Sequence, residues 1–269
     1  MERKIAFFDI DGTLTSEIDS SIPDSAVQAI RQARKNGHLM FINTGRCLFN
    51  LEERFREIGF DGYVCGCGTN IYCKENDALK ELLYVKPSPE AITLIRDESR
   101  KYHVDTLFES KKCVLYDNKR PFFTKAGKLQ VSYFIKRGYD MTLDPDSEDF
   151  TFDKFVMWFE NIDDLASFRK VSDLYFSCID RGENFREFVP HGYSKATGIQ
   201  AILDYYHLSL ENAYAFGDSN NDLSMLSYVP HSIAMGNSSP ASLFEQVTYV
   251  TTNSSENGIK NALEHFHFI

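Results

Sequence analysis

Short apolar runs alternate with helix-like stretches over the first third of the chain, and each run ends in polar or glycine residues. Residues 5–8, 39–42 and 63–65 form the apolar runs, and residues 26–35 and 48–58 have the spacing of helices. A short run that is apolar on both faces is typical of a strand in a parallel sheet. The alternation therefore predicts strands joined by right-handed helical crossovers in an α/β fold.

The ends of these helices are also marked in the sequence. Ser20-Ser21-Ile22-Pro23 predicts the start of the first helix, with a serine cap and a proline in its first turn. Asn36-Gly37 predicts the end of that helix, and Gly59 predicts the end of the second one. Each helix then leads into the next apolar run.

The pattern changes near residue 84, where Lys86-Pro87-Ser88-Pro89 interrupts the chain. A helix is predicted from about residue 89 to 102, and the strand-like runs that follow are spaced closely enough to pair as antiparallel neighbours. The predicted strands are residues 104–108, 113–116, 155–159, 174–179 and 185–189. The acidic residues 144–149 are expected to form a solvated loop. Residues 84–190 are therefore predicted to be a separate α+β insert.

Past Pro190 the earlier alternation of strands and helices returns. Helices are predicted at residues 194–207 and 223–228, after Pro240, and at 256–268, and strands at residues 213–216, 232–235 and 248–250. One parallel-sheet core is thus expected from the two ends of the chain, residues 1–83 and 191–269. The insert would lie between its two halves.

Composition places the 269 residues among ordinary globular proteins, long enough for one large or two ordinary domains. The formal net charge of −10 argues against a general nucleic-acid binder, because such proteins need clustered Lys and Arg for phosphate contacts. An anionic small substrate stays compatible with this charge, since a metal and a few cations can reverse it locally.

The sequence also predicts where the protein is found. No apolar run reaches the length that spans a bilayer, and the first residues do not resemble a signal peptide. The six cysteines are scattered without C-x-x-C or Cys/His zinc spacing, so we expect free buried thiols. A cytoplasmic protein without a membrane partner is therefore expected, as a monomer or a homodimer.

Polar residues lie at four predicted ends of strands or helices. These ends should meet at one edge of the sheet. They are Asp9 with Asp11 and Gly12; Thr44 with Gly45; Lys195; and Asp218 with Asn221 and Asp222. Several carboxylates at one point repel each other unless a cation lies among them, and oxygen ligands suit Mg²⁺. A hydroxyl, backbone N–H groups and a lysine are suitable partners for phosphate oxygens. The set therefore favours a site for Mg²⁺ and a phosphorylated small molecule.

Each of these stretches has a simpler explanation when it is taken alone. Asp9 and Asp11 could merely end a strand, and Thr44-Gly45 could be a plain turn. Residues 217–222 could form a polar turn, although not a calcium loop, because Leu223 stands where the sixth-position glycine is needed. The sequence contains neither a P-loop nor the full dinucleotide-binding glycine motif. Only the combination of all four stretches favours a functional site.

In this order the four stretches resemble the four sequence motifs of the haloacid dehalogenase superfamily. The matching residues are Asp9-Ile10-Asp11-Gly12-Thr13-Leu14, Thr44-Gly45-Arg46, Lys195 and Gly217-Asp218-Ser219-Asn220-Asn221-Asp222. The insert between the second and third motifs looks like the C2 cap of the Cof-type (subfamily IIB) phosphatases, and residues 253–259 are similar to the end of that family. The resemblance implies a Rossmann-like parallel-sheet core domain with an inserted α+β cap domain.

The resemblance also implies a catalytic role for each matching residue. Asp9 would be the nucleophile that forms an aspartyl-phosphate, and Asp11 would be first the general acid and then the general base. Lys195 would neutralise charge on the nucleophile and the phosphate. The side chains of Asp9 and Asp218 and the main-chain carbonyl of Asp11 would bind Mg²⁺.

Further matching residues would hold the phosphate and support the metal. The phosphate oxygens would be held by Gly12, Thr44, Gly45, Lys195 and Asn221. Asp222 would orient the metal's water molecules and fix Lys195. Two positions depart from the family: Cys67-Gly68-Thr69 stands where Asn-Gly-Ala is common, and Ser219 replaces a frequent glycine.

The resemblance implies a Mg²⁺-dependent phosphatase of small phosphorylated metabolites, with sugar phosphates first among them. A phosphomutase of the phosphomannomutase type is an alternative on the same core. A second alternative is a non-catalytic protein that binds phosphorylated metabolites. Substrate choice is expected to lie in the cap, around residues 111–128 and 150–159, where the sequence carries no readable code.

Overall fold

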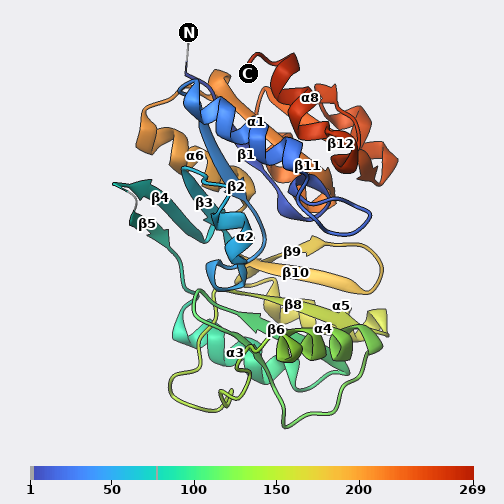
Figure 1. The fold of residues 1–269 in the computed structure, drawn as a ribbon. Coiled ribbons are helices and arrows are strands. Elements are labelled where there is room, and N and C mark those ends of the chain that lie inside the picture. The colour runs from blue at the N-terminus through green and yellow to red at the C-terminus, as the bar shows by residue number, and fades with distance from the viewer. Residues whose placement is uncertain (1–2, 77) are drawn as a thin grey trace. The chain divides into compact units, whose positions relative to one another are not determined.

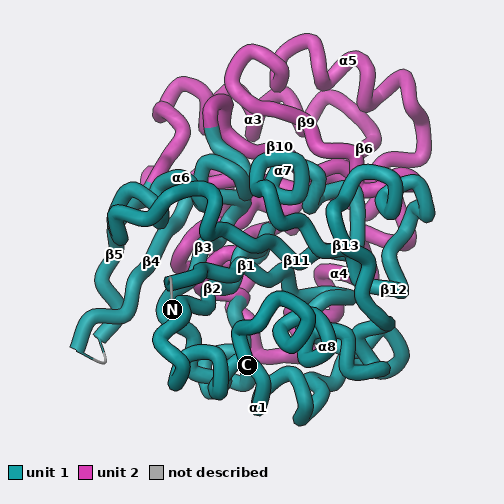
Figure 2. The backbone as a smooth tube through the Cα atoms, turned by 90° about the horizontal axis from the view of Figure 1, so that it is seen from above, with its two compact units in different colours: residues 1–46, 51–84, 193–269 teal, residues 47–50, 85–192 magenta. Residues whose placement is uncertain are grey.

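Two β-sheets organise the computed structural model of the protein, which describes residues 3–76 and 78–269 (Figure 1). The eight-stranded sheet belongs to unit 1 and the five-stranded sheet to unit 2 (Figure 2). Unit 1 comprises residues 1–46, 51–84 and 193–269, and unit 2 comprises residues 47–50 and 85–192. Unit 1 thus combines both ends of the chain, and unit 2 is formed almost wholly by the middle segment.

The sheet of unit 1 has the strand order β13-β12-β11-β1-β2-β3-β4-β5. Neighbouring strands are parallel from β13 to β3, whereas β4 and β5 continue the sheet as antiparallel strands. The strands are β1 (Ile5–Phe8), β2 (Leu39–Asn43), β3 (Gly62–Cys65), β4 (Asn70–Glu75), β5 (Ala78–Tyr84), β11 (Ala213–Ser219), β12 (His231–Ser239) and β13 (Tyr249–Val250). The structure confirms the predicted parallel sheet and adds β4 and β5, which the sequence analysis did not predict.

Helices cover both faces of this sheet. α6 (Lys195–Tyr206) and α7 (Leu223–Leu226) share one apolar core with Phe7 and Phe41, which belong to neighbouring strands. α1 (Asp24–Lys35) packs against α8 (Gly258–His265), and both lie on the other side of β1 and β2 (Figure 1). Because successive side chains of a strand point to opposite faces of the sheet, the fully apolar runs of β1 and β2 can pack against the helices on both faces.

Three helix predictions are wrong in detail. α1 begins at Asp24 with Pro23 at its N-cap and without a side-chain cap, so no serine caps it. The helix predicted at residues 48–58 is divided into a 3₁₀ turn at Leu48–Asn50 and the short α2, Glu53–Arg56. The helix predicted after Pro240 is a 3₁₀ segment, Ala241–Gln246.

Tertiary contacts explain the division of the predicted helix at residues 48–58. The Tyr139 hydroxyl donates to Asn50 Oδ1 at 3.2 Å, and the Phe49 ring packs edge-on against Tyr139 with centroids 5.1 Å apart. Residues 47–50 therefore belong to unit 2, although they lie between two strands of unit 1 in the sequence. Contacts of this kind override the helical preference of the segment.

The sheet of unit 2 is antiparallel throughout, in the order β7-β6-β8-β10-β9. The strands are β6 (Val104–Glu109), β7 (Val114–Tyr116), β8 (Lys154–Phe159), β9 (Phe176–Asp180) and β10 (Phe185–Pro190), and the helices are α3 (Pro89–Ser99), α4 (Lys125–Lys136) and α5 (Ile162–Ser172). α3 and α5 share a phenylalanine-rich core with one face of the sheet, and α4 packs on residues of the other face. The predicted α+β character of this segment is confirmed.

The acidic loop at residues 144–149 is mostly exposed, as predicted, but two of its carboxylates, Asp144 and Asp146, form ion pairs. Asp146 Oδ1 lies 2.6 Å from an Arg100 guanidinium nitrogen, and Lys119 Nζ lies 2.8 Å from Asp144 Oδ2. The loop is therefore held to unit 2 by ion pairs. Over the part of the chain that the structure describes, none of the helices combines the length and the apolar character needed to cross a membrane.

Candidate active site

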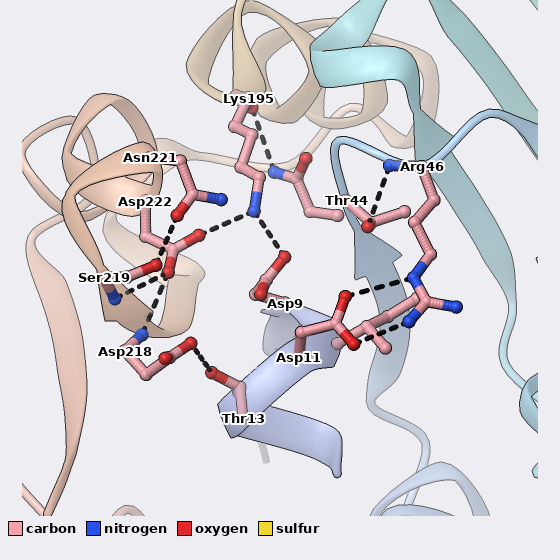
Figure 3. Close-up of polar contacts among 12 residues, drawn as sticks. Asp9, Asp11, Thr13, Thr44, Arg46, Lys195, Asp218, Ser219, Asn221 and Asp222 are labelled. Carbon is pink, nitrogen blue, oxygen red and sulfur yellow. Dashed lines mark hydrogen bonds and ion pairs between the residues drawn. The ribbon is translucent and has the colours of Figure 1, made fainter. Parts of the chain in front are cut away.

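Adjacent parallel strands bring the predicted site residues of unit 1 to one edge of the sheet. β1 lies between β2 and β11, so the residues that follow these strands gather at their carboxyl ends. Asp9 follows β1, Thr44 follows β2, and Asp218 lies at the end of β11. Lys195, the first residue of α6, points toward the same place (Figure 3).

Lys195 is the buried centre of this arrangement, with only 1% of its surface exposed. Its Nζ donates to Asp9 Oδ1 at 2.5 Å and to Asp222 Oδ1 at 2.6 Å (Figure 3). Burial lowers the pKa of Lys195, but the charges of Asp222 and Asp9 outweigh it and hold the pKa above its ordinary value. A cation at a helix start opposes the helix dipole, so these two carboxylates are what stabilises the lysine there.

Asp222 connects the lysine to the loop after β11. Its Oδ2 accepts hydrogen bonds from the backbone N–H groups of Asp218, at 2.9 Å, and Ser219, at 3.1 Å. The residue is fully buried. A Cβ on Gly217 would lie 2.5 Å from Asp222 Cβ, so the close packing of this loop requires glycine. Asp222 therefore fixes both Lys195 and the backbone that carries Asp218.

Three carboxylates meet beside the lysine. Asp9, Asp218 and Asp222 each have one carboxylate oxygen within 4.8 Å of the other two. Burial, opposed by Lys195, raises the pKa of Asp9 to about 6. Burial and the charges of Asp222 and Asp9 raise the pKa of Asp218 to about 8. Burial contributes most to both shifts, and the neighbouring carboxylates add to it, which is the condition that a bound cation relieves.

The donor set is compatible with a hard divalent cation. Asp9 and Asp218 bring carboxylate oxygens together, as predicted for metal ligands. Both oxygens of Asp222 already accept hydrogen bonds from Lys195 and the backbone, which suits a supporting role. The Thr13 hydroxyl donates to Asp218 Oδ1 at 3.1 Å and orients that carboxylate. Oxygen donors with this charge are what Mg²⁺ takes from proteins.

The Asp11 carboxylate does not join this cluster. Arg46 holds it from two sides, with Nε 3.1 Å from Oδ2 and Nη2 2.6 Å from Oδ1 (Figure 3). Arg46 also donates to Glu52 Oε1 at 3.1 Å. The side chain of Asp11 is 62% exposed, whereas that of Arg46 is 19% exposed. The sequence analysis assigned no role to Arg46, although it stands directly after Thr44-Gly45.

The residues predicted to hold phosphate surround the cluster. The Thr44 hydroxyl oxygen accepts a hydrogen bond from the Arg46 N–H at 3.1 Å, so the hydroxyl proton can be donated to a phosphate. The Thr44 backbone N–H instead donates to the Val64 carbonyl. Asn221 is buried, and the Ser219 hydroxyl donates to its Oδ1. Gly45 lies half-buried between Thr44 and Arg46.

Gly12 occupies a position that only glycine can take. Its φ is +81°, and a Cβ there would stand 2.8 Å from Asp218 Cγ. Asn237 Nδ2 donates to the Gly12 carbonyl at 2.8 Å, and Asn43 Nδ2 donates to the Lys195 carbonyl at 3.0 Å. The sequence analysis missed both asparagines. Each lies at the end of a strand beside the site, and that position is the signal that could have pointed to them.

The chain is similar to a known protein family and to several named phosphatases. The model of the haloacid dehalogenase-like hydrolases matches residues 6–263. The putative phosphatase YkrA of Bacillus subtilis is 28% identical, covering 98% of each chain. The 5-amino-6-(5-phospho-D-ribitylamino)uracil phosphatase YitU of the same organism is 25% identical over 99% of each chain. The pyridoxal phosphate phosphatase YbhA of Escherichia coli is 24% identical over 90% of each chain.

Solved structures share the fold over nearly the whole chain. A hypothetical protein from Geobacillus kaustophilus superposes with a TM-score of 0.82 at 25% identity, covering 100% of each chain. A subclass IIB sugar phosphatase, BT4131, superposes with a TM-score of 0.81 at 23% identity, covering 99% of this chain and 100% of that chain. The α/β core and the antiparallel second sheet are therefore features of a known fold.

Proposed function

The chain belongs to the haloacid dehalogenase-like hydrolases, and from that membership we propose that it is a Mg²⁺-dependent phosphatase that works through an aspartyl-phosphate. Its substrates are small phosphorylated metabolites. The observation that carries the proposal is the buried contact of Lys195 with Asp9 and Asp222, beside the carboxylate of Asp218. A protein that only binds metabolites has no need for a buried nucleophile, a lysine and a carboxylate cluster together.

In the first half of the reaction, Asp9 attacks the phosphorus atom and forms an acyl phosphate while the bond to the leaving oxygen breaks. Lys195 is bonded to Oδ1 of Asp9, so Oδ2 is the oxygen positioned to attack. Asp11 gives its proton to the leaving oxygen, so that a neutral alcohol departs. Lys195 and the Thr44 hydroxyl stabilise the charge that develops on the phosphoryl oxygens.

In the second half, a water molecule attacks the phosphorus of the aspartyl-phosphate. Asp11, now ionised, takes the proton of this water, and the bond between phosphorus and Asp9 breaks. The products are inorganic phosphate and a regenerated Asp9 carboxylate, with Asp11 protonated again. The side chains of Asp9 and Asp218 and the Asp11 carbonyl would hold Mg²⁺. Its positive charge would offset the negative charge of the phosphoryl oxygens.

Proton donation by Asp11 requires a change from the arrangement in this structure. Arg46 N–H groups donate to both oxygens of the Asp11 carboxylate, which is therefore turned toward Arg46. We therefore propose that Asp11 turns away from Arg46 to deliver its proton, and that Arg46 holds Asp11 in a defined position before this movement.

Unit 2, whose predicted bounds are residues 84–190, is proposed to act as a C2-type cap domain that determines substrate choice. Sugar phosphates are one proposed substrate class, because the structurally similar BT4131 is a sugar phosphatase. Two of the relatives are named for a phosphorylated uracil derivative and for pyridoxal phosphate, so phosphates of ring-containing metabolites are the second class.

Phosphate release from a panel of sugar phosphates, nucleotides and cofactor phosphates tests the proposal, with Mg²⁺ and then with EDTA. We expect Mg²⁺-dependent hydrolysis, and we expect Asp9→Asn to lower kcat by at least about 10⁴-fold, as removal of a nucleophile does in other enzymes. Asp163→Asn, an exposed change on α5, is the matched control. Substantial hydrolysis by clean Asp9→Asn protein would refute the nucleophile assignment, and an isomeric sugar phosphate instead of free phosphate would indicate a phosphomutase.

A further inference from the structure

Unit 2 contains a cavity of about 940 Å³ that takes no part in the chemistry proposed above. Three segments of unit 2 line it: the first turns of α4, the end of β8, and the turn between β9 and β10. Cavities of this size hold small organic ligands, and their specificity comes from a few polar groups around an apolar surface. The side chains at this cavity have that composition.

Two stacked aromatic rings form the apolar surface of the cavity. Trp158 on β8 and Phe185 on β10 are directly opposed across the strand pair. Their ring centroids lie 4.9 Å apart, and the ring planes are inclined by 8°. Both residues are half-buried and line the cavity. A flat stacked pair offers a π-face on which a third planar ring can lie parallel.

Polar groups of mixed character surround the aromatic pair. Lys125, Glu160, Arg181 and Asn184 line the cavity and supply both donors and acceptors. The Arg181 side chain is 26% exposed, and its guanidinium lies 5.9 Å from the centroid of the Phe185 ring. The nitrogen atoms of a heteroaromatic ring, and the oxygen or amino groups attached to it, can form hydrogen bonds with these polar side chains. Arg181 also lies 3.4 Å from Glu187 Oε2, so its guanidinium is held in place beside the cavity. A purely hydrocarbon ring would make no use of these donors and acceptors and is therefore disfavoured.

The α4 wall of the cavity is preformed. Asp105, which is 1% exposed, accepts from the Thr124 N–H at 2.7 Å, the Thr124 hydroxyl at 2.6 Å and the Phe123 N–H at 3.1 Å. The Thr124 oxygen in turn accepts from the Gly127 N–H at 2.9 Å and caps the helix. These bonds fix α4 to the sheet, so Leu129, although 59% exposed, is held at the cavity. A rigid wall lowers the entropic cost of binding.

We propose that this cavity binds a planar nitrogen heteroaromatic ring, stacked on Trp158 and Phe185 and hydrogen-bonded to the surrounding polar groups. The site is formed by residues of unit 2 alone. It therefore goes beyond the proposed phosphatase reaction and does not depend on it. The ring can arrive as the free base or nucleoside, or as part of a phosphate ester, and the experiment separates these two sources.

Trp158 is the only tryptophan of the chain, so its fluorescence reports directly on this cavity. Wild-type protein is titrated in EDTA, which prevents turnover, with UMP, AMP, uridine and ribose 5-phosphate. We expect saturable changes in emission with UMP and AMP, and binding of ribose 5-phosphate at least about tenfold weaker, because it lacks the ring. Uridine as tight as UMP would show that the ring alone is bound, and tighter UMP would show that the phosphate ester is preferred.

The proposal is overturned if neither nucleotide gives a saturable change, or if ribose 5-phosphate binds as tightly as the nucleotides. Phe185→Ala and Arg181→Gln should each raise Kd by roughly tenfold. Arg169→Gln is the matched control, because Arg169, on α5, pairs with Asp173 just after that helix and does not line the cavity. If either variant fails to fold by circular dichroism, the exposed change Leu129→Ala provides the test, with the same expected direction.

A second assay separates this proposal from the proposed reaction. Acetyl phosphate carries no ring, so its Mg²⁺-dependent hydrolysis by the wild-type chain tests the phosphatase chemistry alone. Hydrolysis without ring-dependent fluorescence changes would refute the cavity proposal and leave the phosphatase standing. Ring binding without hydrolysis of any phosphate would refute the phosphatase and leave the cavity proposal standing.

Discussion

At the scale of single residues, Asp222 determines the geometry of the site without lying where a substrate would react. One of its oxygens binds the Lys195 ammonium, and the other accepts two backbone N–H groups from the Asp218 loop. Removing the carboxylate would leave a buried lysine with one partner and would take this acceptor from two part-buried N–H groups. Losses of this kind cost several kcal/mol, because the remaining groups cannot return to water.

Arg46 offers a test of how Asp11 is positioned. Arg46→Lys keeps the positive charge but loses the planar pair of donors that fixes both oxygens of Asp11. We expect kcat for phosphate release to fall by about tenfold to a hundredfold, because Asp11 would no longer start its movement from a fixed position, and misplacement by about 1 Å has effects of that size.

Arg31→Lys is the matched control for this change. Arg31 bonds the backbone carbonyls of Glu57 and Ile58, away from Asp11, so kcat should stay within about twofold of the wild-type value. Equal kcat values for Arg46→Lys and wild type would show that the positive charge of Arg46, and not its planar pair of donors, is what positions Asp11.

Which site residues can be predicted from sequence depends on where their partners lie. Asp9 and Asp218 were predicted because they follow apolar runs that end at one sheet edge. The hydrogen bond from Asn237 to the Gly12 carbonyl joins residues 225 positions apart. The strand end marks Asn237 as a candidate, but nothing in the sequence marks Gly12 as its partner. The pair formed by Arg46 and Asp11 is of the same kind, since only the folded chain selects which carboxylate an arginine meets.

At the scale of elements, the turn after β1 is the part of the site that tolerates least change. Residues 10–14 form one tight helical turn interrupted at Gly12, whose φ of +81° directs the chain past the Asp218 carboxylate. Thr13, in the same turn, donates to that carboxylate at 3.1 Å. The turn and the β11 loop are therefore packed as one piece, and a side chain between them would separate the predicted metal ligands.

Gly12→Ala tests this packing against Gly37→Ala. Both glycines have φ values in the left-handed region, but a Cβ on Gly37 would meet no atom within 4 Å. Each alanine costs about 1–2 kcal/mol in backbone strain. We expect Gly12→Ala to lower the free energy of unfolding by a further 1–3 kcal/mol, roughly, because it overpacks the Asp218 contact.

Activity should separate the two alanine variants more clearly than stability. Displacement of Asp218 should reduce kcat of Gly12→Ala by about a hundredfold or more, whereas Gly37→Ala should keep the wild-type kcat. Urea unfolding followed by circular dichroism gives the free energies, and phosphate release gives kcat. Equal losses in the two variants would show that backbone strain alone accounts for the effect.

The elements themselves were predictable where one local signal dominated. The fully apolar runs of β1 and β2 predicted buried parallel strands, and the segment from Ser194 to His207 predicted α6. Residues 48–58 carried a helical pattern that contacts with Tyr139 override. β4 and β5 extend the sheet by antiparallel pairing that depends on the neighbouring β3 rather than on their own periodicity.

At the scale of the whole molecule, an excess of negative charge is concentrated where a cation would act. The chain carries a formal net charge of −10, and three of its acidic side chains converge in unit 1 beside one lysine. Without a metal ion, only Lys195 and bound protons reduce this repulsion. Metal binding and proton binding therefore compete for the same carboxylates, and folding stability is linked to both.

This competition predicts how pH changes the effect of Mg²⁺. The pKa of Asp9 is raised to about 6 and that of Asp218 to about 8, from an ordinary value of 3.8. Between about pH 4 and 8 these two carboxylates therefore bind more protons in the metal-free native chain than in the unfolded chain, so their contribution to the free energy of unfolding falls as pH rises. Mg²⁺ binds the deprotonated form, so the rise in Tm that it causes should be small near pH 6 and largest at about pH 9.

Thermal unfolding in EDTA and in saturating Mg²⁺, at both pH values, checks this prediction. Asp218→Asn removes the carboxylate whose pKa is shifted most within the cluster, so its Tm should respond little to Mg²⁺ at either pH. Asp163→Asn, outside the cluster, should behave as wild type. If Mg²⁺ raised Tm equally at both pH values, or equally in Asp218→Asn, the ion would be binding elsewhere than at these carboxylates. A response that grows with pH in wild type and vanishes in Asp218→Asn would locate the ion at the carboxyl ends of β1 and β11.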